Sequence, residues 1–298
     1  MLGHAVISTL NTIPEFSVLA PTRADLDLCD ASAVEDFWNL HQPNLVIHLA
    51  GFVKGILGNL IAGSESLIIN AKIQSNLLQA AVAQPPEAFV VAGTVAAYAY
   101  PYVSLPLNES DFWNGSPHTS EGFYAAGKRV AIPYLEGLSQ MGCGTRFAIL
   151  TNLFGAFDHF GETGAHVVPS LISRFVDAER STLETVKVWG DGATTRDFLF
   201  SEDAAQYLID LLISARVIRD FDCVNVASGR ETSMLELAEL ICQKSRFTGG
   251  IEFDKDAPIG IPRRSINISK LRRTSTHVAT PLEVGLERTI DWYSSLNS

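Results

Sequence analysis

Apolar residues follow two different spacings along the first half of the chain. Short apolar runs are typical of buried strands, and longer stretches with apolar residues three and four apart are typical of helices. The short runs predict strands at 16–20, 44–50, 88–93 and 145–150. The longer stretches predict helices at 32–41, opened by a capping box that begins at Ser32, and at 67–83 and 124–141. Because strands and helices alternate, we predict an α/β fold with a doubly wound parallel sheet.

The pattern becomes looser after about residue 151. It predicts a strand at 186–190, a helix near 202–215 and a strand at 223–227 that returns to the sheet. A helix from Met234, a short strand near Ile251 and a last helix from Pro281 follow. This remainder suits a smaller C-terminal domain packed beside the main one.

Composition and charge limit the classes of protein. A chain of 298 residues with 47% hydrophobic residues can form one large core, or a main domain and a smaller one. Its formal charge of −11 argues against a nucleic-acid-binding or membrane-bound surface. The four cysteines show neither zinc-ligand nor disulfide spacing, so we expect no metal site and a reducing cytoplasm. The N-terminus shows no signal-peptide pattern.

The segment Tyr124-Ala-Ala-Gly-Lys128 carries the clearest candidate chemistry, together with Thr94 upstream. In a helix, the four-residue spacing places the phenol and the ammonium on one face, one turn apart. We expect the positive charge of Lys128 to lower the pKa of Tyr124 and the Thr94 hydroxyl to hold the same oxygen. Such a tyrosine can exchange a proton with a carbonyl that accepts hydride or an alcohol that loses it. The alternative is an amphipathic helix with a half-buried tyrosine.

Further motifs accompany this segment in order along the chain. They are Met1–Val6, Thr22–Leu28, Leu49–Gly51, Gly55–Ile56, Asn70, Gly93–Thr94 with Tyr98, Thr151–Gly155, His166–Leu171, Val188–Gly192, Arg196–Phe198 and Pro262–Arg264. This set resembles the extended short-chain dehydrogenase/reductases that act on nucleotide sugars, within the NAD-dependent epimerases and dehydratases. The resemblance is greatest to the GDP-L-fucose synthases, which are NADPH-dependent 3,5-epimerases and 4-reductases. It implies a Rossmann-like dinucleotide-binding domain at 1–155, with return segments at about 200–227. Residues 156–199 and 228–298 are then mainly the substrate-binding domain.

The resemblance also assigns catalytic and cofactor positions. Thr94, Tyr124 and Lys128 fall on the catalytic positions of the family. Arg23 stands where NAD-preferring relatives carry an acidic residue, so its fork of donors is expected to bind a 2′-phosphate and to favour NADP(H). A solvated loop arginine is the alternative. The cofactor-binding positions are Gly3, Arg23, Leu49, Ala50, Gly51 and Asn70, together with Tyr124 and Lys128.

Substrate positions are implied in the same way. Arg196, with Arg263 or Arg264, is expected to hold the diphosphate of a nucleotide-diphosphate sugar. Asn152 and Trp189 fall where the family contacts substrate, although a tryptophan at a strand end is just as often part of a core.

His166 falls on the epimerisation acid/base of the family, since imidazole exchanges protons near neutral pH. The alternative is a hydrogen-bonded structural histidine. The second epimerisation group, a cysteine two residues after the catalytic Ser/Thr, is replaced here by Ala96. Alanine carries no exchangeable proton, which puts the double epimerisation in doubt. Val95 and Ala96 also replace the Asp-Glu pair of sugar dehydratases, which disfavours dehydration.

We therefore expect an NADPH-dependent reductase of a 4-keto-6-deoxy nucleotide sugar, with epimerisation through His166 left open. A nucleotide-sugar C4 epimerase and a reductase without epimerase activity are alternatives, and a noncatalytic nucleotide-binding relative is an alternative of another class. The resemblance implies a homodimer built on the helices at 67–83 and 124–141.

The N-terminus departs from the family pattern. Gly3 matches only the last glycine of the Gly-x-x-Gly-x-x-Gly turn, so we expect a helix almost from residue 1 and no first strand. About a dozen expected residues are absent. The sequence argument is that the natural chain starts upstream of Met1, with a true truncation as the alternative.

Overall fold

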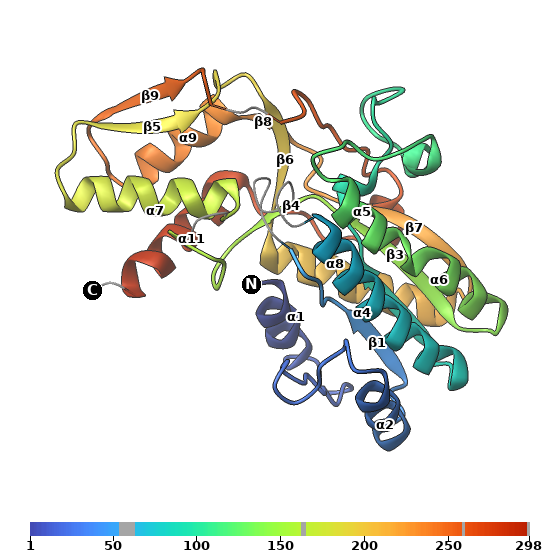
Figure 1. Cartoon of the computed structure of the whole chain (residues 1–298). Helices are drawn as coiled ribbons and strands as arrows, with labels where there is room; N and C mark the ends of the chain where they lie inside the picture. The colour runs from blue at the N-terminus through green and yellow to red at the C-terminus, as the bar shows by residue number, and fades with distance from the viewer. Residues whose placement is uncertain (54–62, 162–164, 258–259, 297–298) are drawn as a thin grey trace.

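A four-stranded parallel sheet lies at the centre of the N-terminal part. The computed structural model describes residues 1–53, 63–161, 165–257 and 260–296. The strands are β1 (Leu45–His48), β2 (Ala88–Ala92), β3 (Gly144–Leu150) and β7 (Phe221–Val226), in the order β1-β2-β3-β7 (Figure 1). The predicted doubly wound α/β fold is confirmed.

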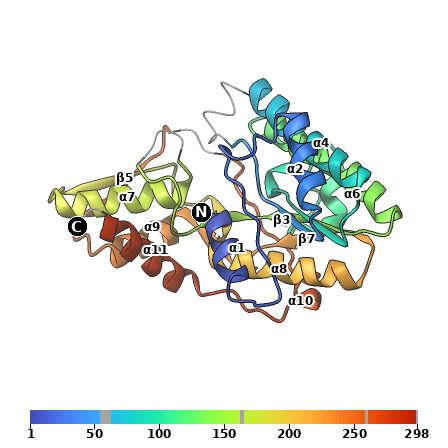
Figure 2. The same ribbon diagram turned by 90° about the horizontal axis from the view of Figure 1, so that it is seen from below.

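Helices cover both faces of this sheet (Figure 2). One layer holds α4 (Gly63–Ala83), α5 (Gly122–Arg129) and α6 (Ala131–Gln140), with α2 (Ala31–His41) beside α4. The other holds α8 (Ser201–Val217), against which α1 (Leu2–Leu10) packs. Every residue of β2 and β3 is buried, as expected of strands covered on both faces.

Close packing of α8 explains one glycine of β3. A Cβ added to Gly144 would lie 1.7 Å from the carbonyl oxygen of Ala215 on α8. No side chain fits at that distance, so the helix backbone rests directly on the strand. This contact fixes the height of α8 above the sheet.

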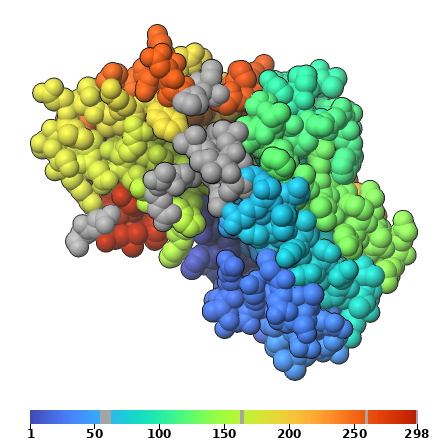
Figure 3. Space-filling model, viewed as in Figure 1, coloured from blue at the N-terminus to red at the C-terminus, as the bar shows by residue number. Residues whose placement is uncertain are grey.

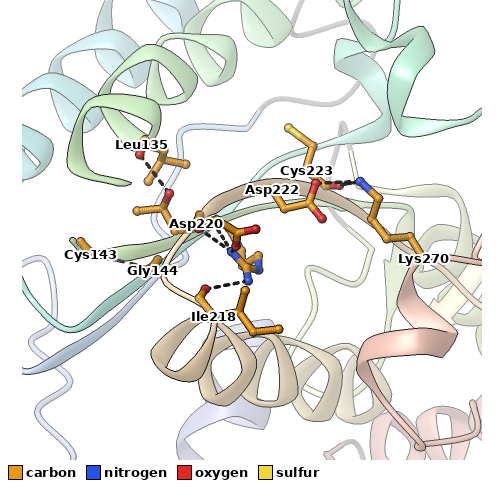
Figure 4. Close-up of polar contacts among 10 residues, drawn as sticks. Leu135, Cys143, Gly144, Ile218, Asp220, Asp222, Cys223 and Lys270 are labelled. Carbon is orange, nitrogen blue, oxygen red and sulfur yellow. Dashed lines mark hydrogen bonds and ion pairs between the residues drawn. The ribbon is translucent and has the colours of Figure 1, made fainter. Parts of the chain in front are cut away.

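Polar contacts fix the start of β7 beside β3 (Figure 4). Arg146 on β3 donates to the carbonyl oxygens of Ile218 at 3.1 Å and Asp220 at 2.6 Å, and pairs with the Asp220 carboxylate at 2.9 Å. Lys270, just before α10 (Leu271–Thr274), binds the Asp222 carboxylate at 2.7 Å. Arg146 on β3 and Lys270 before α10 therefore hold the turn between α8 and β7 and the first residues of β7.

Two local predictions are wrong. Residues 16–20 form no strand and lead into a turn in which Thr22 donates to Asp25. Within the described residues, β1 is the edge of the sheet and has a ladder only with β2, so 16–20 forms no ladder with it. The N-cap of α2 is Asp30, whose carboxylate accepts from the backbone of Ala33 at 3.1 Å, and not Ser32.

The predicted helix at 124–141 is divided into α5 and α6 at Val130. Pro133 has no backbone N–H to donate one turn back, which explains why the hydrogen-bond pattern breaks just before it. The helix expected from residue 1 is confirmed by α1.

The rest of the chain surrounds a second hydrophobic core. Three strands pair as β4 (Asn152–Phe154), β6 (Thr195–Phe200) and β8 (Glu231–Ser233), and β5 (Thr185–Trp189) pairs with β9 (Gly250–Asp254). Helices α7 (Val167–Arg180), α9 (Met234–Lys244) and α11 (Leu282–Leu296) bury Phe175, Leu237 and Leu286 in this core. In Figure 3 the surfaces of these yellow-to-orange segments and of the blue-to-green N-terminal half occupy opposite sides. The exact domain boundaries stay a prediction.

Two short 3-10 helices, Val95–Ala97 and Glu109–Trp113, lie in the long connection between β2 and α5. No helix of the described ranges is both long and apolar enough to cross a membrane.

Candidate active site

Lys128 of α5 joins the carboxyl ends of two neighbouring strands. Its Nζ donates to the carbonyl oxygens of Ala50, just after β1, and Ala92, the last residue of β2, each at 3.1 Å. The side chain is buried, and burial lowers the pKa of Lys128 to about 8. The ammonium therefore lies where a parallel sheet exposes its ligand-binding edge.

The loop after β1 is shaped to admit this ammonium. A Cβ at Gly51 would lie 2.8 Å from Nζ of Lys128 and 3.3 Å from Oδ1 of Asn70. The Asn70 amide, fully buried on α4, accepts from Phe52 N at 2.9 Å and donates to Phe52 O at 2.8 Å. Asn70 therefore fixes the backbone that holds Lys128, and Leu49 and Ala50 are half-buried beside it.

Tyr124 lies one turn before Lys128 in α5, as predicted, and is half-buried. Thr94 directly follows Gly93 at the end of β2, and its hydroxyl also accepts from Ala96 N at 3.2 Å. Burial, and then the negative charge of Glu121, raise the pKa of Tyr124, while a side-chain hydrogen bond with Thr94 opposes them. The structure therefore brings Thr94 and Tyr124 together.

The expected lowering of the Tyr124 pKa by Lys128 is wrong. The ammonium donates to two backbone carbonyl oxygens, and desolvation of the phenol outweighs the other influences. The phenol consequently holds its proton, which is the form that a proton donor needs.

Arg129 secures the loop that follows Thr94 and was missed in the sequence. Its guanidinium donates to the carbonyl oxygens of Ala97 at 2.9 Å, Phe112 at 2.7 Å and Gly115 at 3.1 Å. It also lies 5.0 Å from the centre of the Phe112 ring. Its position directly after Lys128 could have drawn attention to Arg129, but nothing in the sequence pattern indicated its hydrogen-bond partners.

Ala96 sits inside this loop and is buried, with 7% of its surface exposed. It places a methyl group where the resemblance implies a thiol.

The arginines expected to bind a diphosphate lie in different environments. Arg263 is exposed and pairs with Glu231 through Nε at 2.7 Å and Nη2 at 2.9 Å. Arg264 is buried and binds Glu121 and Tyr102. Arg196 on β6 is half-buried, and its Nη1 donates to the carbonyl oxygen of its neighbour Thr195 at 2.7 Å.

The positive charge of Arg264 also acts on Arg196. Burial, and then repulsion by Arg264, lower the pKa of Arg196 to about 10. Glu121 and Tyr102, the partners of Arg264, were not singled out in the sequence. Glu121 could have been found from its position three residues before Tyr124, since residues three apart are neighbours on a helix.

The other candidates are placed as follows. Asn152 on β4 donates to the carbonyl oxygen of Asp197 at 2.9 Å, and Trp189, the last residue of β5, is 55% exposed rather than part of a core. His166 is the exposed N-cap residue of α7. Gly3 lies in the first turn of α1, with nothing within 4 Å of a Cβ added there, and Arg23 is exposed.

The motif residues Gly55 and Ile56 lie outside the described residues. The described ranges hold no cluster of three or more His, Cys, Asp or Glu side chains that could bind a metal ion.

Comparisons with known proteins show the family to which this chain belongs. Residues 1–227 match the model of the NAD dependent epimerase/dehydratase family. A GDP-L-fucose synthase of Sinorhizobium fredii is 31% identical over 296 residues, which cover 99% of this chain and 93% of the relative. The fold is shared with a GDP-L-fucose synthetase from Naegleria fowleri bound to NADP, at 24% identity and a TM-score of 0.88 over 99% of this chain and 91% of that one.

It is also shared with a GDP-6-OMe-4-keto-L-xylo-heptose reductase from C. jejuni, at 21% identity and a TM-score of 0.89 over 99% of this chain and 95% of that one. The chain belongs to the NAD-dependent epimerase/dehydratase family.

Proposed function

We propose that this protein is an NADPH-dependent reductase of a GDP-linked 4-keto-6-deoxy sugar, similar in activity to the GDP-L-fucose synthases. The carrying observation is the position of Tyr124 beside Thr94, one helical turn from Lys128, at the ligand-binding edge of the sheet. A reductase requires a proton donor at the oxygen of the carbonyl that receives hydride. The full-length similarity to a GDP-L-fucose synthase supports the choice of sugar nucleotide.

The residues at the sheet edge fit a dinucleotide. Because residue 51 is a glycine, the backbone after Leu49 and Ala50 passes close to Lys128 at the sheet edge, which is where we assign the cofactor. The exposed Arg23 offers a fork of donors for a 2′-phosphate, and Gly3 lies in the first turn of α1, where a phosphate is favoured. NADPH bound here supplies the hydride.

The chain's own residues manage the proton. Tyr124 gives its proton to the carbonyl oxygen at C4, and Thr94 holds the phenol oxygen. Lys128, fixed by Ala50 and Ala92, provides a positive charge near the cofactor ribose and the developing phenolate. The buried site strengthens each of these electrostatic effects.

The diphosphate of the substrate is assigned to Arg196. Arg263 and Arg264 pair with Glu231 and Glu121, so binding a diphosphate directly would require these ion pairs to break. Asn152 and Trp189 are kept as substrate-binding positions: Asn152 begins β4, which pairs with β6, and Trp189 is the exposed last residue of β5.

The alternative reductase functions differ in whether the enzyme also epimerises the sugar. Ala96 cannot exchange a proton, so His166 is the one family epimerisation position that this chain retains. We therefore favour reduction with at most one epimerisation.

A homodimer and a cytoplasmic location belong to the proposal. The apolar pattern of α4 also predicts Leu77, Leu78, Ala81 and Val82 as dimer contacts; the first three are buried within the chain, whereas Val82 is 37% exposed. Ile68 on α4 and Phe123 on α5 are 55% and 52% exposed and offer the apolar surface instead. The four cysteines are free, as in a reducing compartment. Light scattering that shows a monomer at micromolar concentration would contradict the dimer.

Cofactor turnover tests the function. With GDP-4-keto-6-deoxymannose as substrate, we expect stoichiometric loss of NADPH absorbance at 340 nm and formation of a reduced GDP-sugar. A C4 epimerase would form product without net NADPH loss. A noncatalytic relative would show neither change, and either result refutes the proposal.

A further inference from the structure

Asp197 on β6 is a buried carboxylate that holds the loop after β7. Only 1% of its surface is exposed. Its Oδ1 accepts from the backbone N–H of Ser228 at 2.9 Å, and its Oδ2 accepts from the backbone N–H of Gly229 at 2.7 Å. A buried carboxylate is stable only when hydrogen-bond donors replace water, and bonds to an ionised acceptor are stronger than neutral ones. These two bonds therefore fix β6 beside the end of β7.

The backbone of the same residue holds the end of β3. The carbonyl oxygen of Asp197 accepts from Oγ1 of Thr151 and from Nδ2 of Asn152, each at 2.9 Å. Thr151 directly follows β3, and β3 and β7 are neighbours in the parallel sheet. Asp197 therefore joins the carboxyl ends of two adjacent strands, at the edge where a parallel sheet binds ligands.

The residue on the other side of Arg196 is held as well. Thr195 Oγ1 donates to Oε1 of Glu231 at 2.5 Å, and Arg196 itself pairs with Thr232 in the antiparallel ladder between β6 and β8. Successive side chains of a strand point to opposite faces. Because Asp197 points to the loop after β7, Arg196 points to the opposite face, and its backbone is fixed by contacts of the residues before and after it.

We propose that Asp197 is a positioning residue that fixes two substrate-binding side chains, Arg196 and Asn152, relative to the cofactor-binding sheet. Arg196 directly precedes Asp197, and Asn152 donates to its carbonyl oxygen, so a displacement of Asp197 would move both. Lys128 is held separately, by carbonyl oxygens after β1 and at the end of β2. The inference rests on the proposed function and deepens it, because it identifies the residue that sets the diphosphate site at a fixed place relative to the proton donor.

Two substitutions at this cluster and one control test the role. Asp197→Asn keeps the shape but replaces one acceptor oxygen by an amide nitrogen, so one backbone donor of the loop after β7 loses its partner. Thr151→Val removes only the hydroxyl that donates to the Asp197 carbonyl oxygen. Asp222→Asn is the matched control, because Asp222 lies near the opposite end of β7, where its carboxylate accepts from Lys270 at 2.7 Å.

The measurements separate substrate binding from the rest of the reaction. Calorimetric GDP affinity reports the diphosphate site without turnover, and steady-state kinetics separate KM for the sugar nucleotide from kcat. NADPH affinity, measured for each variant, reports the cofactor site. Burial raises the pKa of Asp197 to about 7, and hydrogen bonds from Ser228 and Gly229 oppose this, so every assay is run at about pH 8, where the carboxylate form predominates.

For Asp197→Asn we expect GDP affinity to fall and KM for the sugar nucleotide to rise by about tenfold, since small misplacements of binding groups are costly. Both kcat and NADPH affinity should stay within about twofold of wild type, because a loss of substrate binding alone raises KM. Thr151→Val, which removes one neutral hydrogen bond, should weaken GDP binding by about threefold. Asp222→Asn should leave GDP affinity unchanged.

Unchanged GDP affinity in Asp197→Asn overturns the inference, as does an equal loss of GDP and NADPH affinity, which would indicate a general loss of structure. If Asp197→Asn does not fold, Thr151→Val decides, and unchanged GDP affinity of that variant overturns the inference. If wild type binds GDP but reduces no 4-keto sugar, the proposed function fails, and the GDP measurements still test the role of Asp197. If wild type reduces the sugar and no variant changes GDP affinity or KM, the inference alone fails.

Discussion

A Cβ on Gly51 would stand 2.8 Å from the Nζ of Lys128, closer than a carbon and an ammonium nitrogen pack. The glycine and the lysine come from opposite sides of the site, one from the loop after β1 and the other from α5. The ammonium of Lys128 can therefore take this position only because residue 51 has no side chain.

The first prediction follows from this contact. Gly51→Ala should displace Lys128 and lower kcat by at least about tenfold, since small misplacements in an active site are costly. Steady-state NADPH oxidation measures the loss. Gly137→Ala on α6, where a Cβ meets nothing within 4 Å, is the matched control and should keep full activity. Equal activity of the two variants would contradict the role of Gly51.

The second prediction concerns the proton donor. Tyr124→Phe removes only the phenol hydroxyl, so kcat should fall by about 10²–10⁴-fold, as general-acid loss usually does, while NADPH affinity stays nearly unchanged. Tyr134→Phe on α6 removes a hydroxyl that lies 3.3 Å from Ser75 and serves as control. Near-normal turnover of Tyr124→Phe would refute the assignment.

The third prediction concerns Lys128 and pH. Burial lowers its pKa from the ordinary 10.5 to about 8, so between these values the unfolded chain binds more protons than the folded one. The cost of burying the ammonium is present in full below pH 8 and disappears as pH rises toward 10.5. The free energy of unfolding of wild type, relative to Lys128→Met, should therefore rise by about 2 kcal/mol between pH 7.5 and 10. Urea titrations of both proteins measure this, and a flat difference would contradict the lowered pKa.

The fourth prediction concerns Arg129. Lysine cannot reach three separate carbonyl oxygens, so Arg129→Lys should leave buried acceptors unpaired and reduce stability by about 1–3 kcal/mol. Because the loop carries Thr94, kcat should fall as well. Arg180→Lys changes an exposed arginine that donates to Ser294 and should alter neither quantity.

The fifth prediction concerns Ala96 and His166. With no thiol in the loop, deuterium from solvent should enter the product at no more than one carbon, or at none, as mass spectrometry and NMR would show. Incorporation at both C3 and C5 would mean that another group replaces the thiol. His166→Asn should remove any single incorporation and leave hydride transfer largely intact.

The sequence predicted the repeating elements well and the three-dimensional contacts poorly. Periodicity placed β2, β3 and α8 to within a few residues, because buried strands and amphipathic helices have distinct spacings. It failed at 16–20, where an apolar run has no strand partner among the described residues. A strand requires a neighbour, and local spacing does not report one.

In the candidate active site, too, local spacing was predictable from the sequence and long-range contacts were not. The spacing of Tyr124 and Lys128 was sufficient to place them one turn apart. The partners of Lys128, Arg129 and Arg264 are backbone carbonyls or distant side chains, such as Glu121, which is 143 residues away from Arg264. Those contacts depend on the packing of α5 against two strand ends and a long loop, which no local pattern contains. The direction of the Tyr124 pKa was missed for the same reason, because burial decides it.

Helix α5 presents three consecutive residues to three different neighbours. Gly127 lies against Asn70, with room for no Cβ, Lys128 points to the strand ends, and Arg129 points to the loop carbonyls. Each residue of a helix is rotated by about 100° from the one before it. One inserted or deleted residue within the helix, before Gly127, would therefore turn all three away from their partners at once. Although loops and helix ends commonly accept changes of length, this short helix should tolerate substitutions on its outer face and no insertion or deletion.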